Sequence, residues 1–126
     1  MRDYEAMRDV LGLIAHANRP LTFNDFKGIQ QRDKVVEELK RLERELLIDS
    51  TLEFEREVCV GGSVGGLTPN GVEFYRLIEN GEVWTIVSAT LSAANVDISY
   101  PLLKEVCEEI VKRYVVSFIP EIKPGK

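Results

Sequence analysis

The chain has 126 residues, of which 44% are hydrophobic and 29% are charged. This composition is typical of a soluble globular protein and excludes a disordered chain, and the length is sufficient to bury a core without disulfide bonds. Its 16 basic and 21 acidic residues give a net charge of -5, the opposite of the basic footprint that nucleic-acid-binding proteins usually carry.

The longest apolar runs are far shorter than the roughly 20 residues of a membrane-spanning helix. The N-terminal residues include acids where a secretory signal peptide would be basic and then apolar. We therefore expect no membrane partner and a cytoplasmic location. Cys59 and Cys107 lie far apart in a chain without an export signal, so we expect two separate reduced residues.

The first predicted helix spans about residues 3 to 17, with Asp3 as its cap. Its apolar residues recur at spacings of three and four: Met7, Val10, Leu11 and Ile14. A turn at Pro20 then separates it from a short second helix, because the residue before a proline avoids helical geometry. Thr22 is the expected cap of this second helix, and Asp25 lies in its first turn.

A longer helix is predicted from about Asp33 to Asp49. Its apolar stripe comprises Val35, Val36, Leu39, Leu42, Leu46 and Leu47. Helices of long, short and long form, with a tight turn before the last, match a helix-turn-helix plan. Two packed helices of any bundle would show a similar spacing.

Beyond Ser50 the apolar period changes to two, which predicts β-strand with one wet face. The predicted apolar side comprises Leu52, Phe54, Val58 and Val60, and it alternates with Glu53, Glu55, Glu57 and Cys59. The strand could return at Arg56-Glu57 or after Gly61-Gly62, and the tolerance of glycine for positive φ favours the second turn. The glycine-rich run 61–66 lacks the Gly-Lys-Ser/Thr ending of a phosphate loop, so we interpret it as the tip of a hairpin.

A further helix is predicted to begin at Thr68, with Pro69 at its first position, where the missing N–H costs nothing. Asn80-Gly81 ends this helix and can cap the next one, which carries Trp84 and ends near Ala94. Trp84 is expected to be a core residue packed on the first or third helix.

The last predicted helix begins at Asp97 or Ser99 and continues to Tyr114. Its apolar stripe comprises Leu103, Val106, Cys107, Ile110 and Tyr114. Residues 115–119 have the β-branched and aromatic content of a strand, before Pro120 stops any regular element.

Taken together, these segments resemble an uncharacterised family of small bacterial and prophage winged-helix proteins, known as a domain of unknown function. The resemblance rests on Arg2-Asp3 with the helix from Met7 to Ile14, on Leu46-Leu47-Ile48-Asp49 leading to Leu52, on Leu67-Thr68-x-x-Gly71-x-x-Phe74 with Trp84 following, and on the closing helix from Ser99 to Tyr114. The sequence departs from the family pattern at Thr51, where members tend to have a glycine after the long helix. The family has no established reaction.

The resemblance implies a mostly α fold with a small β-hairpin, a winged helix-turn-helix with additional C-terminal helices. Residues 1–80 would form the winged-helix domain, and residues 81–126 a helical extension packed on it. Because the last helix carries an apolar stripe without an obvious partner in a minimal winged-helix core, we expect this extension to be the dimerisation element of a homodimer.

An enzyme would need a nucleophile beside a base, a pair of carboxylates with separated pKa values, or a metal set. The single histidine His16, the two separate cysteines and the scattered acids supply none of these in a visible pattern. We therefore expect no catalytic residues, no metal and no cofactor.

Double-stranded DNA is the partner that this fold most often serves, with the helix from Asp33 in the major groove and the wing on the backbone. The candidate DNA-binding residues are Arg32, Lys34, Lys40, Arg41, Arg44 and Ser63. Acids share the same helix: Asp33, Glu37, Glu38, Glu43 and Glu45. We expect a DNA-binding transcriptional regulator of bacterial or prophage origin; the alternative is a protein–protein interaction module without DNA binding, which the net charge fits better.

Overall fold

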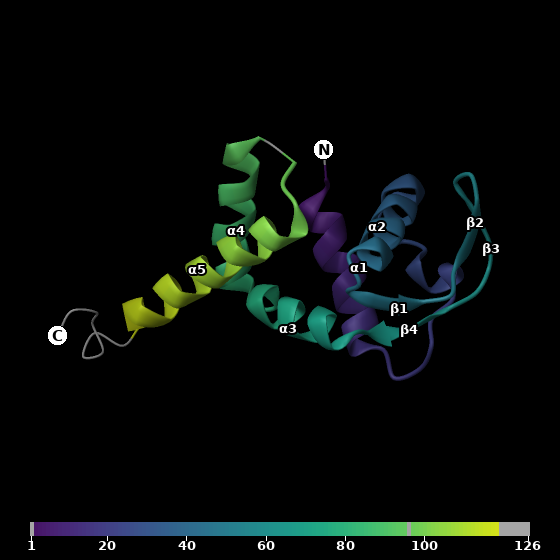
Figure 1. Cartoon of the computed structure of the whole chain (residues 1–126), viewed down its shortest axis with the longest axis horizontal. Coiled ribbons are helices and arrows are strands. Elements are labelled where there is room, and N and C mark those ends of the chain that lie inside the picture. Colours follow the sequence, from purple (N-terminus) through teal and green to yellow (C-terminus); the bar gives the residue numbers. More distant parts are fainter. Residues whose placement is uncertain (1, 96, 119–126) are drawn as a thin grey trace. The chain divides into compact units, whose positions relative to one another are not determined.

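The computed structural model describes residues 2–95 and 97–118 (Figure 1). The described chain is mostly helical, as predicted, with two small antiparallel strand pairs where the sequence analysis expects one hairpin. It divides into two compact units, residues 2–75 and residues 76–118, and the boundary falls within helix α3 (Pro69–Ile78). The division at residue 80 and the packing of residues 81–126 on the first domain stay predictions.

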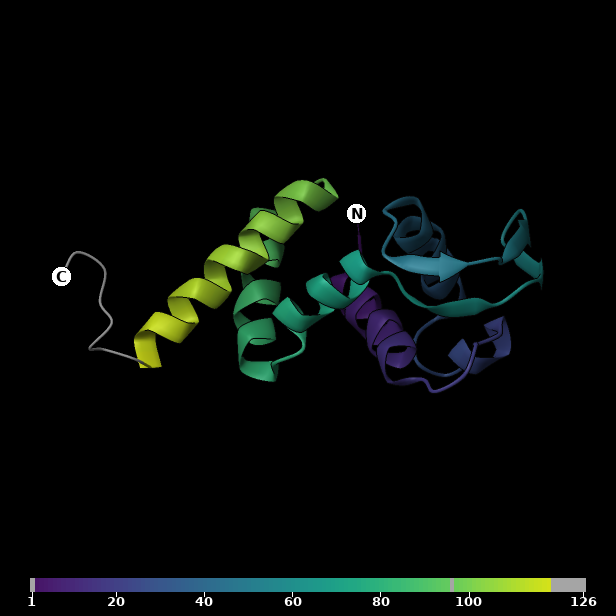
Figure 2. The same ribbon diagram turned by 60° about the horizontal axis from the view of Figure 1, so that its bottom comes forward.

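The N-terminal unit contains two long helices, a short 3-10 helix and four short strands. In chain order these are α1 (Tyr4–His16), η1 (Phe23–Phe26), α2 (Arg32–Arg44), β1 (Ile48–Ser50), β2 (Glu53–Glu55), β3 (Val58–Gly61) and β4 (Val64–Leu67). The three helices followed by antiparallel strands are compatible with a winged-helix-like layout (Figures 1 and 2).

The first helices begin where the sequence predicts. Asp3 caps α1, because its carboxylate accepts a hydrogen bond from the Ala6 amide at 3.0 Å. Thr22 is the N-cap residue of η1, and its amide donates to the Asp25 carboxylate at 2.8 Å. Helix α1 turns its apolar face into the core with Ala6, Met7, Val10, Leu11 and Ile14.

Helix α2 ends at Arg44, so the predicted continuation to Asp49 is wrong. Leu46 adopts a left-handed backbone (φ 62°), its amide donates to the Glu43 carbonyl, and the Leu47 amide donates to the Leu42 carbonyl. These two bonds form a Schellman motif, which closes a helix and usually requires glycine at the left-handed position. The apolar pattern continues past the helix because Leu47 is fully buried in the turn, whereas Leu46 is 68% exposed.

The strands form two antiparallel pairs, β1 with β4 and β2 with β3. The turn between β2 and β3 is at Arg56-Glu57, with Arg56 at φ 58°, so the turn favoured at Gly61-Gly62 is wrong. Gly62 serves a different purpose. At φ +90° it leads the chain past Thr51 so closely that a Cβ atom would lie 2.1 Å from the Thr51 carbonyl oxygen.

This turn changes which side chains share a face of the β2–β3 hairpin. Val58 lies opposite Glu55 and therefore projects from the same face as an acid, while Phe54 lies opposite Cys59. Val58 and Val60 are 49% and 51% exposed. The predicted apolar face that joined Phe54 to both valines is wrong, because a two-residue turn at Arg56 sets a different register.

Helix α3 begins at Pro69 with Thr68 before it, as predicted. The Thr68 hydroxyl accepts a hydrogen bond from the Gly71 amide at 3.0 Å and donates to the Leu46 carbonyl at 2.7 Å. The Thr68 amide donates to the Leu47 carbonyl. A side chain at Gly71 would place its Cβ 2.0 Å from that same carbonyl oxygen, which explains the glycine three residues after the threonine.

The C-terminal unit contains α4 (Gly81–Ala94) and α5 (Tyr100–Phe118), which pack against each other. The Asn80 side chain accepts from two amides of the first turn of α4, which confirms the predicted cap. The buried residues of these helices are Val83, Trp84, Val87, Leu91, Leu103 and Cys107. The burial of Trp84 confirms a core position, and its packing on the first or third helix stays a prediction.

The strand predicted for residues 115–119 is wrong for residues 115–118, which continue α5. Ile119 lies outside the described residues. The physical reason is that adding residues to an existing long helix gains one hydrogen bond per residue, which outweighs the small helix penalty of two valines.

Candidate functional site

Helix α2 and the β2–β3 hairpin are the elements on which the candidate residues lie. The buried residues of α2 are Val35, Val36, Glu38, Leu39 and Leu42. The opposite face carries a stripe at spacings of four, three and four: Asp33, Glu37, Lys40 and Arg44. Two acids and two bases make this outward stripe neutral, with the acids at the N-terminal end of the helix and the bases at its C-terminal end, as the helix dipole favours.

Three of the predicted DNA-binding cations make contacts within the fold, namely Lys34, Lys40 and Arg41. Lys34 pairs with Asp3 at 2.7 Å, and this hydrogen bond raises the pKa of Lys34. Arg41 pairs with Glu45 at 3.5 Å. Lys34 and Arg41 therefore each lie beside a carboxylate that offsets their charge.

Lys40 connects α2 to the tip of the hairpin. Its ammonium group donates to the Arg56 carbonyl at 2.9 Å, lies 3.7 Å from the Glu57 carboxylate, and stands 5.2 Å from the centre of the Phe54 ring. The Phe54 ring also meets Phe23 of η1 edge to face, with centroids 6.2 Å apart. These contacts join the helix and the hairpin into one surface.

Ser63, the sixth candidate residue, lies at the base of the hairpin. Its amide donates to the Thr51 hydroxyl at 3.1 Å, and its carbonyl accepts from the Thr51 amide at 2.8 Å. The hairpin tip is at Arg56-Glu57 instead, so the interpretation of the glycine-rich run as the tip is wrong. Ser63 therefore follows the C-terminal end of β3, whereas the hairpin tip precedes its N-terminal end.

The β2–β3 hairpin is acidic and partly apolar. Glu53, Glu55 and Glu57 outnumber the single base Arg56, and all four side chains belong to exposed residues. The valines Val58 and Val60, each about half exposed, both lie on β3 of this hairpin.

A buried ion cluster beneath α2 had no place in the sequence analysis. Arg2 is 4% exposed and donates from Nε to Glu38 and from both Nη atoms to Glu45, each of these bonds being 2.9 Å long. Burial raises the pKa of the Glu38 carboxyl, against the opposing attraction of Arg2. One signal was available: Glu38 lies three residues after Val35 and four before Leu42, on the apolar stripe.

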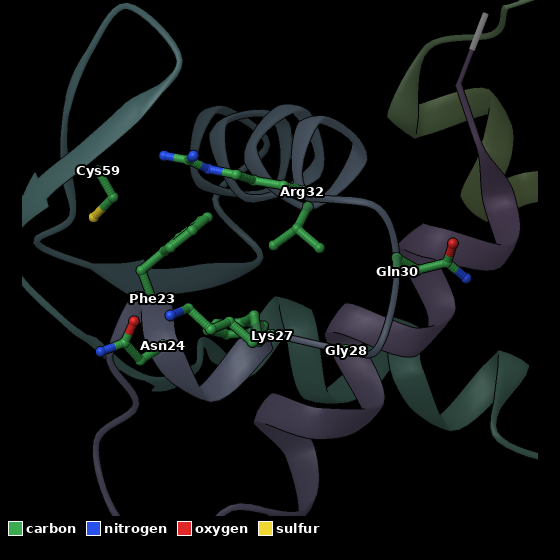
Figure 3. Close-up of a pocket in the computed structure, with 9 residues that line it drawn as sticks. Phe23, Asn24, Lys27, Gly28, Gln30, Arg32 and Cys59 are labelled. Atoms are coloured by element: carbon green, nitrogen blue, oxygen red, sulfur yellow. The ribbon is translucent and has the colours of Figure 1, made fainter.

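A cavity of about 440 Å³ opens at the start of α2 (Figure 3). The lining residues come from η1, the loop after it, the start of α2 and one strand of the hairpin: Phe23, Asn24, Phe26, Lys27, Gly28, Gln30, Arg32, Val35 and Cys59. None of these residues is acidic, and in the described part of the chain neither Lys27 nor Arg32 has an ion-pair partner. Of the predicted DNA-binding residues, the structure brings only Arg32 to this cavity.

The C-terminal unit has an apolar groove of about 470 Å³ between α4 and α5. Its lining residues are Ile86, Thr90, Val106, Glu109, Ile110, Arg113, Tyr114 and Ser117. The Tyr114 hydroxyl donates to Glu82 at 2.6 Å, and this bond raises the pKa of Tyr114. Leu102, Ile86 and Val115 are 45%, 45% and 47% exposed.

Within residues 2–95 and 97–118, no three His, Cys, Asp or Glu side chains lie close enough together to hold a metal ion. No helix in the same residues combines the length and apolarity needed to cross a bilayer. Both cysteines are free thiols, and burial raises the pKa of Cys107 to about 12. Catalytic inactivity stays a prediction.

Comparisons with protein-family models, with curated proteins and with solved structures found no match to this chain. The resemblance to a winged-helix family therefore stays a prediction, and the proposals below depend on the residues of the chain itself.

Proposed function

We propose that the N-terminal unit is a winged-helix binding module that recognises a protein partner through α2 and the β2–β3 hairpin. The observation that carries the proposal is the exposed face of the hairpin, where Val58 lies opposite Glu55 and is half exposed. Apolar side chains bordered by charged ones match the core and rim of a protein interface.

The charge distribution supports a protein partner over duplex DNA. A DNA backbone is bound by Lys and Arg side chains that replace its counterions. The outward stripe of α2 is neutral, and the hairpin that would lie on the backbone has three acids and one base. The negative charges of the hairpin and of the phosphates would repel each other. A protein partner does not need a positively charged binding surface, because its own surface can be neutral or basic.

A photo-crosslinking amino acid at Val58 tests this proposal in cells that produce the protein. Val72, an exposed valine on α3 of the same unit, is the matched control position. One discrete crosslinked partner from position 58, absent from position 72 and lost when Val60→Asp is added, is the expected result. Equal crosslinking from both positions, or none from position 58, would refute the proposal.

Duplex DNA is the second candidate, favoured by the exposed cations of α2 and of the loop after η1 that have no ion pair in the described residues: Lys27, Arg32 and Arg44. On this hypothesis one copy binds DNA weakly, and a dimer binds more tightly because it presents two helices to adjacent half-sites. A duplex titration at about 50 and about 200 mM salt tests it, since phosphate-driven affinity falls steeply over that range. Binding should weaken in Arg44→Glu, and absence of binding at the lower salt would exclude this candidate.

We also propose that the C-terminal helices carry a homodimer contact. The half-exposed Leu102, Ile86 and Val115 lie on the two helices that form the apolar groove, and a second copy would remove this apolar surface from water. Light scattering at micromolar concentration should give about twice the 14.3 kDa of the chain. A mass of one chain, unchanged in Val115→Asp, would refute the contact.

A further inference from the structure

We infer that the cavity at the start of α2 binds an aromatic acid, meaning an anionic head group carried on a flat apolar body. The inference goes beyond the proposed partner recognition and does not depend on it. The volume of the cavity, about 440 Å³, lies within the range of small-molecule sites. Such sites are mostly apolar and have a few polar groups that fix the orientation of the ligand.

The lining of the cavity carries positive charge. Lys27 and Arg32 both line it, both are exposed, and neither has an ion-pair partner in the part of the chain that the structure describes. Five other cations of the same unit have an ion-pair partner, whereas Arg44 and Arg56 have none in the described residues; these five are Arg2, Arg19, Lys34, Lys40 and Arg41. The chain has a net charge of -5, yet this cavity is lined by two cations and no acid. An anionic ligand could form charge-assisted hydrogen bonds with both cations.

Another part of the lining is apolar. Phe23, Phe26 and Val35 contribute to the walls, and in Figure 3 the Phe23 side chain lies between the charged ends of Arg32 and Lys27. An inorganic anion would use the cations alone. A ligand with an aromatic body would also contact the partly exposed Phe23 ring, with the buried Phe26 ring (1% exposed) behind it, and its carboxylate could pair with the planar guanidinium group of Arg32 by two hydrogen bonds.

The walls of the cavity are held in place by contacts outside it. Asp25 of η1 accepts from the Thr22 amide and pairs with Arg19 at 2.7 Å, and these bonds fix the short helix. The Gln30 side chain points away from Lys27 in Figure 3, because its amide donates to Asp9 at 2.8 Å. A cavity with preformed walls loses less entropy when a ligand binds.

The experiment is a titration of the ¹⁵N-labelled full chain with phenylacetate, followed by amide chemical shifts. The uncharged phenylacetamide is the control ligand, and Arg44→Gln is the control variant because Arg44 is also an exposed α2 arginine without an ion pair in the described residues. We expect saturable shifts at residues 23–32 and at Cys59. Affinity should fall at least about tenfold for phenylacetamide and in Arg32→Gln, but not in Arg44→Gln.

Two further ligands identify the source of the acid. A tetrapeptide that ends in a free phenylalanine carboxylate, compared with its amide, represents a polypeptide terminus. Binding at least about ten times tighter than phenylacetate would assign the site to such a terminus, and equal or weaker binding would assign it to a free small acid. Both results support the inference, since the shared chemistry is the same.

Several results would overturn it. These are the absence of shifts at about 20 mM phenylacetate, equal affinity for the amide, and equal effects of Arg32→Gln and Arg44→Gln. Inorganic phosphate that shifts the same amides with the same affinity would show a simple anion site. Displacement of phenylacetate by a duplex at about 50 mM salt would assign the two cations to a nucleic-acid backbone.

Discussion

Replacing Arg2 by methionine tests the buried ion cluster beneath α2. Methionine replaces the aliphatic part of the arginine side chain but cannot form the bonds to Glu38 and Glu45. The Glu38 carboxylate, in a residue that is 3% exposed, then loses its main partner. Removal of one member of a buried pair typically costs about 3–5 kcal/mol, a large part of the 5–15 kcal/mol that stabilises a typical domain. At about 4 °C or more per kcal/mol, the melting temperature should fall by at least about 12 °C.

The matched control is the double variant Arg2→Met/Glu38→Leu, which removes both buried charges. It should recover most of the lost stability, because an apolar pair of similar volume often replaces a buried ion pair without loss. Glu45 is less affected, since it is 11% exposed and lies 3.5 Å from Arg41. Urea unfolding followed by far-UV circular dichroism measures all three proteins.

The pH dependence adds a second readout. The pKa of Glu38 is raised in the folded protein above its usual 4.5, so the cost of its charge is absent below about pH 4.5 and grows as the pH rises through the folded value. Loss of Arg2 raises that pKa further, and the single variant should therefore lose less stability at pH 5 than at pH 7.5. A single variant that melts within about 1 °C of the parent, or a double variant as unstable as the single one, would refute the reasoning.

Two other predictions concern stability. Gly71→Ala should destabilise the chain by about 1–3 kcal/mol or more, because its Cβ would lie 2.0 Å from the Leu47 carbonyl oxygen, whereas Gly81→Ala, with open space around it, should cost less than about 0.5 kcal/mol. Equal melting temperatures of these two variants would contradict the close approach. Trp84→Ala should cost about 3–5 kcal/mol, since Trp84 is 5% exposed, and an unchanged melting temperature would show that the ring has a role outside the core.

Helix starts were predictable from the sequence because their signals are local. Asp3, Thr68 and Asn80 each accept amide hydrogen bonds from within the next three residues, so the cap and its partners lie in one short segment. The same holds for the apolar face of α1.

The turns were harder to predict because two of them lack the expected residue. Leu46 and Arg56 both adopt positive φ, a conformation that glycine usually supplies. The prediction therefore put the hairpin turn at Gly61-Gly62, whereas Arg56 forms it. Contacts elsewhere in the fold accompany these conformations: the Leu46 carbonyl accepts from Thr68, and the Arg56 carbonyl accepts from Lys40. Neither contact has a signature in the local sequence.

The candidate site depended on tertiary pairing for the same reason. The sequence of α2 shows five bases and as many nearby acids. It does not show which of them pair across the fold, such as Lys34 with Asp3 or Arg2 with Glu38. The cavity at Arg32 involves η1, the loop after it and a strand of the hairpin, and its residues are separated by up to 36 positions from Phe23 to Cys59.

The bonds at the two ends of the β-region divide it into a fixed base and a variable arm. Thr68 ties the end of α2 to the start of α3 through Leu46 and Leu47, and Thr51 ties the incoming and outgoing strands together at Ser63. Everything between Thr51 and Ser63 leaves and re-enters the fold at one clamped point. An insertion or deletion at Arg56-Glu57 would therefore change the length of the arm and its contacts with Lys40 but leave the bonds between Thr51 and Ser63 in place, which makes this turn a position where a foreign loop can be grafted.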